Sequence, residues 1–223
     1  VLAGLVAVGM LAIRFVVVSR PAAARHPSLP TKSRTSWRDL IRLPSVLPML
    51  ACSLLIPFGN EILNVIYGRW LESSFGLSVE SIGASAIVLG VAELTGEAII
   101  AIFSDRVGKR NLAILGALLG VVAYLALPLL SATGQIGLAL LGVAGVYLGF
   151  EILVVGTLPI LSELAPDARG AMLSTASAMQ SAGRLFGSWV GLALFAAGIW
   201  PAALLAAFVN LTVSVILWRW ARA

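Results

Sequence analysis

Charged residues are scarce in this chain. Only 11% of its 223 residues are charged and 60% are hydrophobic, whereas a typical soluble domain has about 25% charged residues. A chain of this length cannot bury so much apolar surface within itself, which excludes an ordinary soluble fold. One cysteine and one histidine exclude a disulfide framework. The sequence shows no metal-binding cluster, no nucleophile beside a base and no phosphate-binding loop, so we expect neither an enzyme nor a cofactor or metal.

Apolar residues gather instead into seven long stretches. A helix needs about 20 mostly apolar residues to cross a membrane. The stretches that approach or exceed this length are residues 1–18, 45–69, 82–103, 112–130, 136–160, 171–197 and 200–218. They lack the alternating pattern of membrane β-strands. The sequence therefore predicts an all-α membrane protein with seven transmembrane helices.

Positive charge is concentrated in alternate connections between these stretches. The net charge is +5, which on a soluble protein would suggest nucleic acid as a partner. Here it fits the excess of lysine and arginine in cytoplasmic loops, and we expect no nucleic acid partner. The basic residues concerned are Arg20, Arg25, Lys32, Arg34, Arg38, Arg42, Arg106, Lys109, Arg110, Arg169, Arg219 and Arg222. The asymmetry predicts that the first span runs from outside to inside and that the C-terminus is cytoplasmic.

Residues 19–43 form the one long connection. This segment is basic and contains several prolines and serines, as flexible linkers do. Within it, the spacing of apolar residues in Ser36–Leu43 predicts a short helix lying in the membrane interface. The later connections are short, so residues 44–223 are expected to form a compact set of six helices. Trp70, like three other tryptophans, lies at the end of a predicted span, where interfacial aromatics are common.

Four of the stretches carry polar or charged residues where lipid would surround them. A charge at the bilayer centre costs about 2.5–3.5 kcal/mol by insertion scales, so such residues are functional candidates. They are Glu61, Asn64, Glu93, Glu97, Glu151 and Arg184. At 1.5 Å per residue, Glu93, Glu151 and Arg184 lie about 17, 18 and 22 Å from the cytoplasmic end, near the midplane. The position of Glu61 is nearer the outer side. The first, fourth and seventh stretches have no central charge.

Two interpretations of these charges remain open at the level of the sequence. Glu93 and Glu97 are four residues apart and share one helical face. A carboxyl group held beside a like charge in a low dielectric can take up and release a proton. Alternatively, Arg184 neutralises Glu151 and the pair joins two helices without any further role.

Two motifs carry a family resemblance. The segment AIFSDRVGKR resembles the short conserved loop of the major facilitator superfamily. Four residues match that loop, Lys109 occupies a commonly basic position, and Ala101 replaces its leading glycine, as in the copy found in C-terminal halves. The matching residues are Asp105, Arg106, Gly108 and Arg110. Residues Gly149–Met172 are similar to the tenth span and following loop of bacterial drug and sugar efflux members. That loop is matched by Glu163, Leu164, Pro166, Arg169 and Gly170.

The resemblance implies a twelve-span fold in two six-helix halves. Residues 1–18 would be the sixth span, 19–43 the central cytoplasmic loop, and 44–223 the C-terminal half. The chain is then expected to be the C-terminal portion of a longer polypeptide, embedded in the bacterial cytoplasmic membrane. Its expected partners are the lipid bilayer, a small-molecule substrate and the missing N-terminal half.

The resemblance also implies a function. We expect a secondary active transporter that exports a small organic solute by alternating access, driven by the proton gradient and without a cofactor. Asp105–Arg110 would be a cytoplasmic latch loop, and Glu163–Gly170 a second gate. The alternatives are a uniporter or cation symporter of the same fold, or a seven-span sensor or partner protein that transports nothing.

Overall fold

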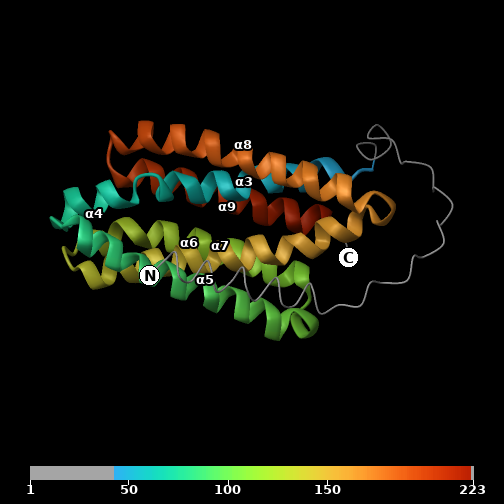
Figure 1. Cartoon of the computed structure of the whole chain (residues 1–223), viewed down its shortest axis with the longest axis horizontal. Coiled ribbons are helices and arrows are strands. Elements are labelled where there is room, and N and C mark those ends of the chain that lie inside the picture. Colours follow the sequence, from blue (N-terminus) through green and yellow to red (C-terminus); the bar gives the residue numbers. More distant parts are fainter. Residues whose placement is uncertain (1–42, 222–223) are drawn as a thin grey trace, which may run out of the picture. The chain divides into compact units, whose positions relative to one another are not determined.

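The computed structural model describes residues 43–221, and almost all of them are helical (Figure 1). The elements are α3 (Val46–Asn64), α4 (Tyr67–Phe75), α5 (Val79–Val107), α6 (Lys109–Ser131), α7 (Ile136–Leu164), the 3-10 turn η1 (Pro166–Ala168), α8 (Arg169–Phe195) and α9 (Ile199–Trp220). No strand occurs between residues 43 and 221. The predicted first span and the basic loop with its interfacial helix, up to residue 42, lie outside the described residues.

Five stretches of this helical chain are long and apolar enough to cross a membrane. Helices α3 and α4 together form one of them, and α5, α6, α7 and α9 form the others. The sixth expected span, 171–197, corresponds to α8, which is long enough but less apolar than the rest. Its serines, Gln180 and Arg184 lower its hydropathy, because part of its surface serves polar contacts and not lipid.

The charged segment between α5 and α6 is barely a loop. Helix α5 continues through Arg106 to Val107 and α6 begins at Lys109, so that Gly108 alone joins them. Gly108 has φ +86°, a conformation that strains any residue with a side chain. The sequence predicted a loop here, whereas the structure places Asp105 in the last turn of α5 and Arg110 in the first turn of α6.

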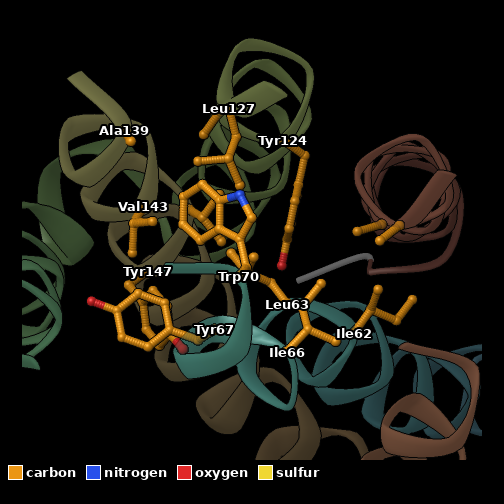
Figure 2. Packing of buried hydrophobic residues seen from close by; sticks show 14 of the residues in the cluster. Ile62, Leu63, Ile66, Tyr67, Trp70, Tyr124, Leu127, Ala139, Val143 and Tyr147 are labelled. Atoms are coloured by element: carbon orange, nitrogen blue, oxygen red, sulfur yellow. The ribbon is translucent and has the colours of Figure 1, made fainter. Parts of the chain in front are cut away.

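The core is built where α6 packs on α7 and α9 and where α3 packs on α8 and α9. One cluster of buried side chains surrounds Trp70 and includes three tyrosines, Tyr67, Tyr124 and Tyr147 (Figure 2). Trp70 is only 1% exposed. The prediction that Trp70 marks a membrane interface is therefore wrong, because α4 turns its indole ring inward among apolar side chains. The other three tryptophans at predicted span ends, Trp200, Trp218 and Trp220, are exposed.

Three glycines bring α8 into backbone contact with α3. A Cβ atom added at Gly183, Gly187 or Gly191 would lie 2.1, 2.6 or 2.7 Å from the carbonyl oxygens of Leu54, Phe58 and Ile62 respectively. Both sets are spaced by four residues, so the two helices run parallel and touch along one face of each. Small residues commonly permit such an approach in membrane proteins. The contact fixes which α8 side chains lie beside Glu61, whose Cβ is also next to Gly187.

We predict that Gly187→Ala lowers the thermal stability of the detergent-solubilised chain. The added methyl group has no space, and overpacking of this kind costs about 1–3 kcal/mol. Gly90→Ala is the matched control, because Gly90 is also inside a helix but has nothing within 4 Å of the added Cβ. That control should be neutral or stabilising by up to about 1 kcal/mol. Equal unfolding temperatures for the two variants would contradict the close α3–α8 contact.

Candidate functional site

Glu61 lies close to an interruption in a membrane-spanning helix. The span from Val46 to Phe75 is divided into α3 and α4 at Val65 and Ile66. At this point the Val65 N–H binds the carbonyl of Glu61, while the Ile66 N–H binds that of Leu63 in a tighter turn. Glu61 is near the midpoint of the combined helical span. Interrupted helices near the bilayer midplane are typical of binding sites in transporters.

The Glu61 carboxylate is held by side chains from two helices. The Asn64 amide nitrogen lies 3.2 and 3.3 Å from its two oxygens, and the Ser188 hydroxyl lies 3.3 Å from Oε1. Arg184 Nη1 lies 3.7 Å from Oε2. The phenol of Tyr147, on α7, donates to Asn64 Oδ1 at 2.9 Å. We call these five residues the Glu61 site.

Arg184 pairs with Glu61, and the static pair with Glu151 that the sequence left open is not formed. The reason is the α3–α8 contact, which sets α8 against α3 along its glycine face. The pair is unequal, since the Glu61 side chain is 14% exposed and that of Arg184 is 54% exposed. A separation of 3.7 Å is long for a charged hydrogen bond, which normally measures about 2.7–2.9 Å.

Glu93, Glu97 and Glu151 form a second group, here called the acidic trio. The Cβ of Glu151 would lie 2.8 Å from a Cβ added at Gly96, so α5 and α7 touch there. Glu93 and Glu97 lie on either side of Gly96, and both interact electrostatically with Glu151. Glu93 is at the midpoint of α5, and Glu151 is near the midpoint of α7. Within residues 43–221, none of the three forms an ion pair.

Tyr147 connects the two groups, and the sequence analysis did not single it out. It is 3% exposed, and its hydroxyl binds Asn64 of the Glu61 site while Glu151 of the acidic trio lies one turn further along the same helix. Tyr147 is one helical turn from Glu151 on α7, which was the available signal. Ser188 was missed too, because a serine four residues after Arg184 is unremarkable among the many serines of α8.

The charged residues near Gly108 contact the C-terminal ends of α7 and α9 at one end of the bundle. Lys109 Nζ lies 2.6 Å from Glu163 Oε1. Arg110 donates from Nε to the carbonyl of Leu217 at 3.3 Å and from Nη2 to that of Trp218, in the last turn of α9. A cation is unfavourable at a helix N-terminus such as that of α6. Glu163 compensates the charge of Lys109, and the carbonyl groups at the end of α9 compensate that of Arg110.

The other predicted latch and gate residues lie around this contact. Asp105 lines a cavity of about 650 Å³ together with Lys109, Glu163 and Trp220, while Arg106 is exposed in the last turn of α5. Arg169 begins α8 and donates from Nε to the carbonyl of Ser162 at 3.2 Å. Pro166 starts η1 and Gly170 is exposed in the first turn of α8. The latch loop and the second gate, predicted as separate features, are thus joined by the Lys109–Glu163 pair.

Comparison with known proteins decides the family. Residues 49–223 match the family model described as Major Facilitator Superfamily. The chain belongs to the major facilitator superfamily. The resemblance drawn from the segments around Asp105 and Glu163 is thereby confirmed, as is an all-α membrane fold. The family is one of membrane transporters, so the match favours a transporter over an enzyme.

A curated relative agrees with this assignment. An uncharacterized MFS-type transporter, YceJ of Bacillus subtilis (strain 168), is 30% identical over 155 residues. The matched region covers 68% of this chain and 38% of that protein. The chain therefore spans well under half the length of the relative it matches.

We predict that Glu163→Gln increases the reactivity of Lys109 toward an amine-specific reagent. Losing the carboxylate frees the ammonium group, and an exposed ion pair is worth about 0.2–1 kcal/mol, so the rate should rise by up to about fivefold. Mass spectrometry of the labelled peptide measures it. Asp105→Asn serves as the matched control, since Asp105 lines the same cavity but does not pair with Lys109. Equal labelling of Lys109 in both variants would show that the pair is absent in solution.

Proposed function

We propose that this chain is the C-terminal portion of a secondary active transporter that exports a small organic solute in exchange for protons. In this mechanism two six-helix halves expose a central site alternately to the two sides of the membrane. The chain would supply the second half, with its C-terminus in the cytoplasm of a bacterium. Transport would need no cofactor, because the proton gradient is the energy source.

The observation that carries the proton coupling is the acidic trio. Glu93 and Glu97 on α5 and Glu151 on α7 lie in the middle parts of two membrane-spanning helices that touch at Gly96, and none has a basic partner within residues 43–221. Keeping all three ionised in a low dielectric is costly, so at least one of them is expected to bind a proton. Those same residues contain no group of three acidic, histidine or cysteine side chains placed to hold a metal ion, which favours a proton over a coordinated cation.

The exposure of α5 and α8 supports a second half as partner. Of the five spans, α5 has the smallest buried share. On α8, large apolar side chains are exposed, with Trp189 at 63% and Leu185 at 52%. These two helices lie at opposite edges of the bundle (Figure 1). Lipid and a second helical half together would cover such surfaces.

We predict that Glu151→Gln and Glu93→Gln each uncouple transport from the proton gradient. The amide cannot take up or release a proton, so solute movement in vesicles should no longer respond to an imposed pH difference. Glu72→Gln, an exposed site on α4, controls for the acid-to-amide change. A pH response that survives in both trio variants would exclude this coupling. Transport driven equally well by a sodium gradient would favour the symporter alternative.

We also predict that Asp105→Asn reduces transport without preventing membrane insertion. As a latch, Asp105 would accept charge-assisted hydrogen bonds from the other half in one state. Losing such a bond costs about 1.5–3 kcal/mol, which corresponds to about a tenfold or greater loss of rate. The initial transport rate should be compared at matched amounts of membrane-inserted protein, with Asn111→Ala as the neighbouring control. A normal rate would mean that the charged segment around Asp105 only orients the protein in the membrane. It would also support the sensor interpretation.

A further inference from the structure

We propose that the Glu61 site binds the ammonium group of a positively charged organic substrate, which displaces Arg184 from the Glu61 carboxylate. The inference rests on the proposed transport function and names the class of its substrate. It also assigns Tyr147 as a positioning residue.

The first step is the weakness of the Glu61–Arg184 pair. Glu61 is the shielded partner and Arg184 the exposed one, and their charged atoms are 3.7 Å apart. In the same chain, Lys109 and Glu163 approach to 2.6 Å although both are more exposed than Glu61. A shielded, ionised carboxylate is stabilised by a cation beside it. Because Arg184 is held loosely, a cation that fits the Glu61 carboxylate better can replace it.

The second step is that Glu61 is oriented independently of Arg184. Asn64 contacts both of its oxygens, and Tyr147 binds Asn64 Oδ1 and so directs the amide nitrogen toward Glu61. The Ser188 hydroxyl lies 3.3 Å from Glu61 and 3.0 Å from the Arg184 carbonyl, and its single hydrogen serves one of them at a time. The carboxylate therefore keeps its place when Arg184 leaves.

The third step is an unused acceptor on α3, in the residue that precedes Glu61. Asn60 is 5% exposed, and its Oδ1 is buried without a hydrogen-bond partner in the described part of the chain. Asn60 and Asn64 share a face of α3, as Glu151 and Tyr147 share a face of α7. The two helices run in opposite directions (Figure 1), and Asn64 meets Tyr147, so Asn60 lies level with Glu151. A buried acceptor at this level calls for a donor, and an ammonium group has three.

The fourth step is the balance of charge. Within residues 43–221, Glu61 and the acidic trio contribute four acids to the middle parts of the helices, where Arg184 is the one basic residue. An anionic substrate would have to bind among these acids, whereas a cation reduces their repulsion. Both the charge and the free acceptor therefore favour a protonated amine.

The experiment measures binding to the full chain in lipid nanodiscs by calorimetry, with empty nanodiscs as the blank. The probes are the butyl, cyclohexyl and adamantyl ammonium ions, each compared with the alcohol of the same carbon skeleton. We expect at least one ammonium ion to bind more tightly than its alcohol. Glu61→Gln should weaken that binding by tenfold or more, and Glu72→Gln should not change it.

Arg184→Gln distinguishes the proposal from its opposite. If Arg184 only occupies the cation position, removing it should tighten ammonium binding about tenfold, or about 1.4 kcal/mol. If Arg184 instead binds an anionic substrate, the variant should lose affinity for the matching carboxylates and gain none for ammonium ions, which would overturn the proposal. Helical content and gel-filtration profile confirm that each variant is folded. Because the two substitutions are expected to act in opposite directions, general damage to the fold cannot imitate the result.

Tyr147→Phe tests the positioning role. It should reduce the preference for ammonium over alcohol, since Asn64 is no longer held, whereas Tyr124→Phe removes another buried phenol, bound to the Gly59 carbonyl, and should leave the preference unchanged. No preference for any ammonium ion in the unmodified chain would overturn the inference. Proton coupling is measured separately through Glu151, so either proposal can fail while the other stands.

Discussion

The contact between α3 and α8 determines the rest of this arrangement. Because Gly183, Gly187 and Gly191 have no side chains, the backbone of α8 rests on the carbonyl groups of α3. This proximity brings Arg184 and Ser188 to Glu61. Glu151 instead lies where α7 touches α5. A bulkier residue at any of the three positions would push the helices apart. It would also move Arg184, the only arginine near the middle of the described helices, away from Glu61.

Close backbone approach also explains the second group of charges. At Gly96, α5 comes near enough to α7 for Glu151 to be flanked by Glu93 and Glu97. A bundle that served only a structural purpose would gain from apolar residues at these positions, because replacing buried charges with well-packed apolar side chains is often neutral or stabilising. Two of the acids, Glu93 and Glu97, are on α5, the span with the smallest buried share.

The sequence was sufficient to predict the helices and the family, but not the pairing of the charges. Apolar length located the spans, and the segments around Asp105 and Glu163 indicated the superfamily, since both signals are local in the chain. The sequence suggested Glu151 as a partner for Arg184, and the pair with Glu61 could not be predicted without the contact between α3 and α8. Tyr147 was missed for a similar reason: its spacing from Glu151 is a weak signal, and its contact with Asn64 depends on how α7 packs against α3.

Helix α7 joins the features that the sequence presented as separate. Tyr147 and Glu151 lie on it at the level of the Glu61 site and the acidic trio, and Glu163, in its last turn, binds Lys109 at the end of the bundle. Pro159 lies between these levels and cannot donate its backbone nitrogen to the helix. A change of charge at Glu151 and a change of contact at Glu163 therefore act on one helix with a weakened point between them. That arrangement suits a protein in which binding at the centre and closure at one end must alternate.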